Sequence, residues 1–403
     1  MANVSSSNGL EKRPKLRFPG FDEPWKAAHL SDYFAKNIKK NTDGAITNVI
    51  CNSAKQGLIP QRDYFDKDIS NSDNTDGYYI IETNDFVYNP RKSTDAPYGP
   101  ISSYNYPEAG IVSPLYLCFR AKQEINPLYF EWYFRSSAWH RYIYMSGDSG
   151  ARHDRVSIKD DIFFAMPINI PSATEQERIA RFLNAIEQKI DKQRSLVEAL
   201  KKYKRGAVQK LFSEMDMKQW ELVRLKDVVN IFDGTHQTPN YKTTGVRFIS
   251  VENILNPLAT QKYISEDDYK KEFKVHPEYG DVLMTRIGDI GRTCYVNFDS
   301  DIAYYVSLAL FKCSSKIDGR FLAACISTNT FQKELWERTL HIAFPKKINT
   351  GEIGECHIRL PSRERQIVIA SYLDVIEKKI QLAEKQLNLM QLIKIGLMQQ
   401  LFI

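Results

Sequence analysis

The sequence lacks the features typical of secreted, membrane-spanning or metal-binding proteins. Its six cysteines are scattered, no two stand at C-x-x-C spacing, and none forms a zinc-type cluster with histidine. The residues before Phe18 contain no apolar run that could act as a signal peptide. No stretch of about 18 uncharged apolar residues is present to cross a membrane. These absences predict a cytoplasmic protein with reduced thiols and no metal site.

The motifs of common DNA-modifying and nucleotide-binding enzymes are also missing. The chain has no G-x-G-x-x-G after a strand, no G-x-x-x-x-G-K-[ST] and no H-E-x-x-H. It lacks the Asn/Asp-Pro-Pro-aromatic motif of amino-methyltransferases; the nearest segment, Asn89-Pro90-Arg91, has no aromatic residue. Glu and Lys are too common to dismiss a nuclease-like Asp…Glu-x-Lys arrangement by inspection, although none stands out. The sequence therefore predicts no catalytic residue and no bound cofactor.

What remains is an ordinary globular composition with a slight positive charge. Of the 403 residues, 43% are hydrophobic and 26% are charged, and the formal net charge is +6. A chain of this length predicts two or three domains. The charge permits an anionic partner such as nucleic acid but does not require one.

The chain contains an internal repeat. The 42 residues from Pro171, PSATEQERIARFLNAIEQKIDKQRSLVEALKKYKRGAVQKLF, align without a gap with PSRERQIVIASYLDVIEKKIQLAEKQLNLMQLIKIGLMQQLF, which starts 190 positions later at Pro361, and 15 positions are identical. A weaker repeat opens each half, with WKAAHLSD from Trp25 and WELVRLKD from Trp220. Each half therefore consists of a Trp-containing entry, a divergent globular part and a similar helix.

Both repeated segments carry apolar residues at alternating steps of four and three, which predicts a heptad seam. The seam residues are Ile179, Leu183, Ile186, Ile190, Val197, Leu200 and Leu211 in the first copy, and Ile369, Leu373, Ile376, Ile380, Leu387, Met390 and Leu401 in the second. A lysine interrupts both seams at the same place, Lys204 and Lys394. A polar seam residue costs stability but can fix register.

We expect the two helices to pack antiparallel on each other, since each needs a partner for its stripe. The alternative is that each helix packs only on its own domain. The predicted organisation is a flexible N-terminus at 1–17, a globular domain at 18–170, a helix at 171–214, a second domain at 215–360 and a second helix at 361–403. Ser172 or Thr174, and Ser362, are candidate helix caps.

Both globular parts are expected to be mixed α+β folds. The segments GVRFISV, DVLMTRI and TCYVNF have the β-branched and aromatic content of short strands. Residues 128–143 and 320–338 each have the apolar spacing of a helix.

Loops that combine glycine with polar and basic residues are candidate DNA contacts, because glycine allows close approach and Arg suits phosphate or guanine. In the second half these loops are 232–245 and 286–292, followed by a basic segment from 344. Their candidate residues are Thr235, His236, Thr238, Tyr241, Lys242, Arg286, Arg292, Lys346 and Lys347. In the first half the loops 88–100 and 146–161 provide Arg91, Lys92, Arg152, His153 and Arg155.

This combination resembles the specificity subunits of type I restriction-modification systems over essentially the whole chain. In that family a strand runs into Pro-Leu/Ser…Glu-Gln-x-x-Ile-Ala-x-x-Leu, which PSATEQERIARFL from Pro171 matches. The second copy departs from it, with Arg365 where the first has Glu175. The segments DGTHQTPNY from Asp233 and GDVLMTRIGDIG from Gly280 are also similar to second-domain sequences of the family.

The resemblance implies two mixed α/β target-recognition domains, separated by two long antiparallel helices that form a coiled coil with an internal pseudo-twofold repeat. Each domain would read half of a split site on double-stranded DNA. The helices would set the spacer and dock two methyltransferase subunits, which carry S-adenosylmethionine and modify adenine. Restriction subunits would add ATP- and Mg-dependent cleavage. This chain would bind no cofactor and perform no chemistry.

Three other interpretations stay open from the sequence. The chain could serve a combined cleavage-methylation system of the type IIB kind, which neighbouring coding regions would reveal. It could be a standalone methyltransferase or nuclease, which the missing motifs disfavour. It could also be a duplicated protein-binding scaffold, which salt-dependent DNA binding would exclude.

Overall fold

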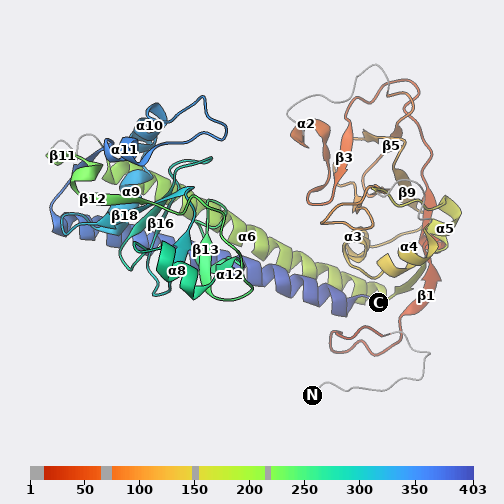
Figure 1. Cartoon of the computed structure of the whole chain (residues 1–403). Helices are drawn as coiled ribbons and strands as arrows, with labels where there is room; N and C mark the ends of the chain where they lie inside the picture. Colours follow the sequence, from red (N-terminus) through yellow and green to blue (C-terminus); the bar gives the residue numbers. More distant parts are fainter. Residues whose placement is uncertain (1–12, 65–74, 148–153, 214–218) are drawn as a thin grey trace. The chain divides into compact units, whose positions relative to one another are not determined.

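The computed structural model describes residues 13–64, 75–147, 154–213 and 219–403 (Figure 1). The chain divides into two compact units. The first unit contains Met1–Gln193 and Gln386–Ile403, and the second contains Arg194–Lys385. Each unit therefore includes part of both repeated helices.

The first unit is built on a four-stranded antiparallel sheet with the order β2 (Phe34–Lys36), β9 (Leu117–Ala121), β6 (Phe86–Tyr88), β7 (Ile101–Ser103). Three antiparallel pairs complete it: β1 (Lys26–His29) with β10 (Pro167–Ile170), β3 (Ile50–Ser53) with β4 (Gly57–Pro60), and β5 (Tyr79–Ile81) with β8 (Gly110–Val112). Its short helices are α1 (Leu30–Tyr33), α2 (Gln61–Tyr64), α3 (Pro127–Arg135), α4 (His140–Ser146) and α5 (Asp160–Phe164).

The core of the first unit is aromatic. The Phe34 ring meets Phe119 edge-on with centroids 5.3 Å apart, and it meets Phe130 of α3 at 5.0 Å. The end of the second long helix joins this core, since Leu401 and Phe402 are buried in it. The globular part is therefore completed by residues more than 200 positions away in the sequence.

The second unit repeats the four-stranded antiparallel sheet as β12 (Val229–Asp233), β18 (Leu308–Cys313), β15 (Val282–Thr285), β16 (Thr293–Tyr295). A three-stranded mixed sheet has the order β14 (Tyr263–Ile264), β13 (Val246–Ile249), β17 (Ile302–Tyr304), and β11 (Glu221–Arg224) pairs with β19 (His357–Leu360). Its helical segments are η2 (Leu225–Asp227), η3 (Pro257–Ala259), α8 (Glu266–Glu272), α9 (Gly319–Ile326), α10 (Asn329–Glu337) and α11 (Thr350–Gly354). The three predicted strands are confirmed as β13, β15 and β16.

The two helices predicted at 128–143 and 320–338 are each broken in two, so those predictions were wrong in extent. α3 ends at Arg135, where the Ser136 hydroxyl donates to the Tyr133 carbonyl at 2.6 Å. α9 ends at Ile326, and the Thr328 hydroxyl caps α10 by accepting from the Phe331 amide at 3.3 Å. Ser and Thr side chains compete for backbone groups, which ends one helix and starts another within a continuous apolar pattern.

The repeated segments form two helices of 39 residues each, α6 (Ala173–Leu211) and α12 (Arg363–Leu401). The predicted caps are present, since the Ser172 hydroxyl accepts from the Glu175 amide at 3.3 Å and the Ser362 hydroxyl from the Arg365 amide at 3.4 Å. All 14 predicted apolar seam residues are buried or half-buried. The heptad seam is therefore confirmed in both helices.

Within each unit the two helices run antiparallel and are joined by an ion pair made from the same two repeat positions. In the first unit Lys394 Nζ lies 2.7 Å from the Glu187 carboxylate. In the second unit Lys204 Nζ lies 2.7 Å from Glu377. The interrupting lysine of each seam thus binds a glutamate of the other helix. The idea that each helix packs only on its own domain is wrong.

The start of α6 differs from that of α12 because of one substitution between the repeats. Glu175 is 1% exposed and binds Arg17 through two hydrogen bonds of 2.8 Å. Its carboxylate also accepts from Trp25 Nε1 at 3.2 Å. The equivalent residue of α12, Arg365, is exposed. A buried carboxylate therefore ties residues 17 and 25 to the helix in the first unit alone.

We predict that Glu175→Ala lowers the free energy of unfolding of the first unit by about 3 kcal/mol, because it leaves the Arg17 guanidinium without its partner. The matched substitution Arg365→Ala removes an exposed side chain and should change stability by less than about 0.5 kcal/mol. Amide hydrogen exchange during urea titration reports the two units separately. Equal effects of the two substitutions would contradict the prediction.

Candidate nucleic-acid interface

Three loops of the second unit meet at one arginine. Arg286 follows β15, and its Nε lies 3.0 Å from the carboxylate of Asp233, at the end of β12. Its Nη1 donates to the Ile348 carbonyl at 3.1 Å, and the Ile348 amide donates to the Arg286 carbonyl at 3.0 Å. Arg286 therefore connects the loops 233–238, 286–292 and 340–348, and this set of loops is called the second-unit cluster below.

This placement changes the role expected for Arg286. Its side chain is only 8% exposed and its donors face Asp233 and Ile348. A guanidinium held inside the fold is not available to guanine or phosphate. The structure thus corrects the expectation that Arg286 touches DNA, because an ion pair with a neighbouring loop occupies the side chain. Arg286 is a positioning residue for the second-unit cluster.

The loop 286–292 is a tight turn that exposes a second arginine. The Thr285 carbonyl accepts from the Gly291 amide at 3.0 Å, and the Thr285 hydroxyl accepts from the Arg292 amide at 3.0 Å. Gly288 and Gly291 have φ of 84° and 93°, which only glycine adopts without strain. Arg292 is 53% exposed and pairs with Asp289 on the same turn. Of the two predicted arginines here, Arg292 is the one at the surface.

The loop 233–238 passes very close to the end of β17. A Cβ on Gly234 would stand 2.4 Å from the Tyr304 carbonyl oxygen, so only glycine fits there. The Thr235 amide donates to the same carbonyl at 3.1 Å. His236 and Thr238 are exposed. The fixed backbone therefore presents two of the predicted polar side chains to solvent.

The basic residues of the third loop are also exposed. Lys346 lies over the Trp336 ring, with Nζ 4.1 Å from the ring centroid, and Lys347 forms backbone bridges to Ile287 and Leu340. The remaining two candidates lie beside another sheet. The Lys242 amide donates to the Tyr263 carbonyl at 2.8 Å, and the Tyr241 ring packs against Phe248 at 5.6 Å.

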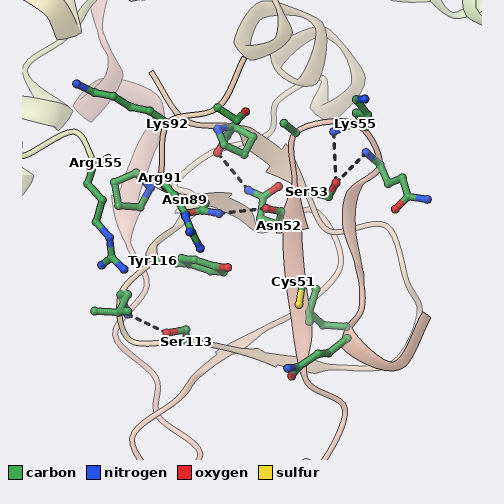
Figure 2. Close-up of a pocket in the computed structure, with 18 of the residues that line it drawn as sticks. Cys51, Asn52, Ser53, Lys55, Asn89, Arg91, Lys92, Ser113, Tyr116 and Arg155 are labelled. Atoms are coloured by element: carbon green, nitrogen blue, oxygen red, sulfur yellow. Dashed lines mark hydrogen bonds between the residues drawn. The ribbon is translucent and has the colours of Figure 1, made fainter. Parts of the chain in front are cut away.

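The two predicted loops of the first unit are joined to each other. Arg91 and Arg155 form an antiparallel backbone bridge, and the Lys92 amide donates to the Asp154 carbonyl at 2.8 Å. All three basic residues line one pocket of about 840 Å³ (Figure 2). Arg152 and His153, also predicted here, lie outside the described residues.

The pocket includes residues that the sequence did not single out. The turn between β3 and β4 adds Lys55 and Gln56, while Tyr116 projects into it beside Arg91 (Figure 2). Burial raises the pKa of the Tyr116 hydroxyl, so it is a neutral donor at neutral pH. Asn52, which also lines the pocket, is buried and donates to the Val87 carbonyl at 2.7 Å. This hydrogen bond connects β3 to β6. The polar turn sequence SAKQG was the available signal for the β3–β4 contribution.

The pocket of the first unit and the second-unit cluster share a chemistry. Both sites combine guanidinium or ammonium groups with neutral hydrogen-bonding side chains. In both, backbone hydrogen bonds and bridges between loops hold these side chains in place. Such sets suit phosphate oxygens and base edges. Among the described residues there is no group of three His, Cys, Asp or Glu side chains that could hold a metal ion. No helix of the described part of the chain is long and apolar enough to cross a membrane.

These features define a duplicated α/β protein with paired helices and one basic loop site in each unit. The sequence matches the family described as type I restriction modification DNA specificity domain at residues 28–202 and again at 217–391. The two matches cover most of the chain, so the protein belongs to this family.

Individual relatives agree with this membership. The chain is 26% identical over 250 residues to the type I restriction enzyme MjaVIII specificity subunit of Methanocaldococcus jannaschii, which is 56% of this chain and 58% of that relative. The match thus spans little more than half of that protein's length. A chain from a structure of complex assembly and conformational transition in the type I R-M system aligns with TM-score 0.62 and 17% identity, over 96% of this chain and 99% of that chain. The type I restriction-modification S subunit of M. genitalium aligns with TM-score 0.58 and 14% identity, over 97% and 99%. The structural likenesses confirm the predicted fold.

We predict that Arg286→Ala destabilises the second unit by about 1–3 kcal/mol, because the buried Ile348 carbonyl loses its donor and Asp233 loses its ion-pair partner. Arg292→Ala, on the same turn but exposed, should change stability by less than about 0.5 kcal/mol. Urea unfolding gives both values, and amide exchange in loops 233–238 and 340–348 should rise for Arg286→Ala. If Arg286→Ala keeps wild-type stability and exchange, Arg286 does not position the cluster.

Proposed function

We propose that this chain is the DNA-specificity subunit of a type I restriction-modification complex, and that each unit reads one half of a bipartite DNA site. The observation that carries the proposal is the presence, in both copies of a DNA specificity domain, of a basic loop site on a rigid sheet. Duplicated readers suit a site with two separated halves, since each reader contacts its own groove.

In the first unit we expect the basic residues and the neutral residues of the pocket to make different contacts with DNA. Arg91, Lys92 and Arg155 would bind phosphates or guanine edges from the walls of the pocket, while Gln56 and Tyr116 would bind base edges. The second unit would contact phosphates and base edges through His236, Thr238, Arg292, Lys346 and Lys347. Tyr241 and Lys242 would contact the flank of that half-site.

We infer that the chain performs no chemical step itself. S-adenosylmethionine would be bound by methyltransferase subunits, and ATP and Mg would be bound by restriction subunits, all in the cytoplasm beside the DNA. The relatives named above belong to type I systems, which favours this assignment over a combined cleavage-methylation system.

Exposed apolar residues on α12 support docking of a methyltransferase subunit on the helices. In the second unit Val368, Val375 and Leu382 are 58%, 53% and 58% exposed. Their seven-residue spacing places them on one face, apart from the buried seam. Such a solvent-exposed stripe fits an amphipathic helix of a partner protein. The repeat-related positions of α6 are occupied by Arg178, Ala185 and Lys192, so the two helices would offer unequal surfaces.

The proposal predicts the outcome of a binding selection with the full chain on random DNA duplexes. Two fixed half-sites separated by unspecified bases should be enriched, and affinity should fall steeply with salt, as phosphate contacts require. Arg155→Ala should relax one half-site only, because an arginine–guanine contact contributes about 1–3 kcal/mol of discrimination. Arg292→Ala should affect the other half-site. Enrichment of no sequence, or salt-independent binding, would contradict the proposed function.

A second prediction concerns the spacer between the half-sites. Seventeen positions separate Glu187 from Lys204 in α6, and seventeen separate Glu377 from Lys394 in α12. Inserting one heptad after Val197 alone makes these lengths unequal, so one ion pair must break and stability should fall. Inserting a heptad after both Val197 and Leu387 keeps them equal while lengthening the pair by about 10 Å.

The doubly inserted variant should select the same two half-sites with about three more base pairs between them, since one base pair occupies about 3.4 Å. Insertion of three residues at both places is the control, because it rotates later residues off the seam and should reduce solubility. A doubly inserted variant that binds DNA with an unchanged spacer would show that helix length does not set the spacing.

A further inference from the structure

The third loop of the second unit has a fixed base. The Leu340 amide donates to the Lys347 carbonyl at 2.8 Å, which closes the loop on itself. The Gly288 amide donates to the Lys346 carbonyl at 2.8 Å, which attaches the loop to the turn 286–292. Figure 1 shows this segment, between α10 and α11, extending from the body of the second unit. The base is therefore held by the Arg286-centred contacts while the tip projects.

The tip of this loop consists of apolar side chains in full contact with solvent. Ile342 is 99% exposed and Phe344 is 103% exposed, more than any other large apolar residue among those described. Exposing two such side chains on one short loop opposes the hydrophobic effect. Two neighbouring apolar side chains that the fold leaves exposed indicate a surface that binds a partner molecule.

The surroundings of the tip are basic. Lys346 and Lys347 follow Phe344 after Pro345, and Arg292 lies on the adjoining turn. Trp336 is half exposed, with the Lys346 ammonium 4.1 Å from its ring centroid and the His341 ring 4.4 Å away. This charge complements a polyanion, and the loop is continuous with the cluster proposed to read DNA.

We propose that Phe344, assisted by Ile342, inserts between two stacked base pairs of the half-site bound by the second unit. The inference rests on the proposed function, because it needs DNA on this face. Apolar wedges of Phe and Ile are known to enter base steps and partly unstack them while flanking cations hold the phosphates. Lys346 and Lys347, beside the tip, would bind phosphates that flank the opened step.

The wedge would also contribute to specificity without hydrogen-bonding any base. Pyrimidine–purine steps unstack most easily, so the sequence at the wedge would be selected through its deformability. The binding selection should therefore show a preference for a flexible step such as TA or CA within the second-unit half-site. That preference should depend on Phe344.

The test uses the full chain and a selected duplex carrying 2-aminopurine at successive positions of the second-unit half-site. Wild-type protein should raise the fluorescence at one step, where stacking is lost. The double variant Ile342→Ala/Phe344→Ala should abolish this rise and weaken binding about tenfold, the effect of losing one aromatic base stack. Phe344→Trp should retain the rise, because a larger aromatic ring can still insert.

Two matched controls separate insertion from general effects. Leu255→Ala removes another apolar side chain of the second unit that is 70% exposed, and it should change neither fluorescence nor affinity. Lys346→Ala/Lys347→Ala should weaken binding to all sequences and reduce the salt dependence by about two phosphate contacts. The unfolding midpoint of each variant should match wild type, since the changed side chains are exposed.

The possible results separate failure of the wedge from failure of the proposed function. Wild-type fluorescence and affinity in the Ile342→Ala/Phe344→Ala variant would overturn the wedge while leaving the proposed function intact. The same result together with loss of methyltransferase binding would assign the tip to a protein partner instead, and it too would overturn the wedge. Failure of the wild-type chain to bind any DNA would overturn the proposed function, and the wedge with it.

Discussion

The ion pair between Glu187 and Lys394, repeated as Glu377 with Lys204, fixes the relation between the two long helices. A heptad seam of aliphatic residues tolerates sliding by one repeat, because the next heptad offers a similar surface. Sliding by one repeat would separate each lysine from its glutamate, which costs up to about 1 kcal/mol for a partly exposed pair. The apolar seam supplies the driving force for association, and the two ion pairs favour the observed antiparallel register. Both globular units depend on this choice, because each takes its final core residues from the helix that starts in the other half of the chain.

The sequence predicted this helical pairing well because its signals are periodic and repeated. The seam positions, both caps and the interrupting lysines could be identified by comparing two copies of the same segment. The breaks at Ser136 and Ser327 were missed, since the apolar spacing continues across them and only side-chain hydrogen bonds end the helices. Strands that contain β-branched and aromatic residues, such as β13, were predictable. The order of the strands in the sheets was not. Strand order depends on contacts between distant segments, and neither periodicity nor composition encodes them.

For the loop sites, too, the sequence predicted which residue types are present but not the surroundings of each side chain. Sequence reasoning located the basic loops, and the structure joins Arg91 with Arg155 and the loop of Asp233 with that of Arg286. It could not distinguish Arg286 from Arg292, which stand six residues apart on the same glycine-containing segment. Burial separates them, because one faces a carboxylate inside the fold and the other faces solvent. Tyr116 was not predicted at all, since its approach to the pocket follows from the pairing of strands far apart in the chain.

The burial of Leu401 and Phe402 in the core of the first unit has a consequence for biosynthesis. A ribosome releases the chain from its N-terminus, so the strands of the first unit emerge long before the residues that complete their core. All residues of the second unit, Arg194–Lys385, leave the ribosome before Leu401 and Phe402 do. The first unit therefore cannot complete its core until the end of α12 has emerged, although its strands are made first. Apolar surface that stays exposed during this interval is prone to aggregation. Nascent chains that stop short of α12 lack Leu401 and Phe402 and therefore cannot complete the core of the first unit.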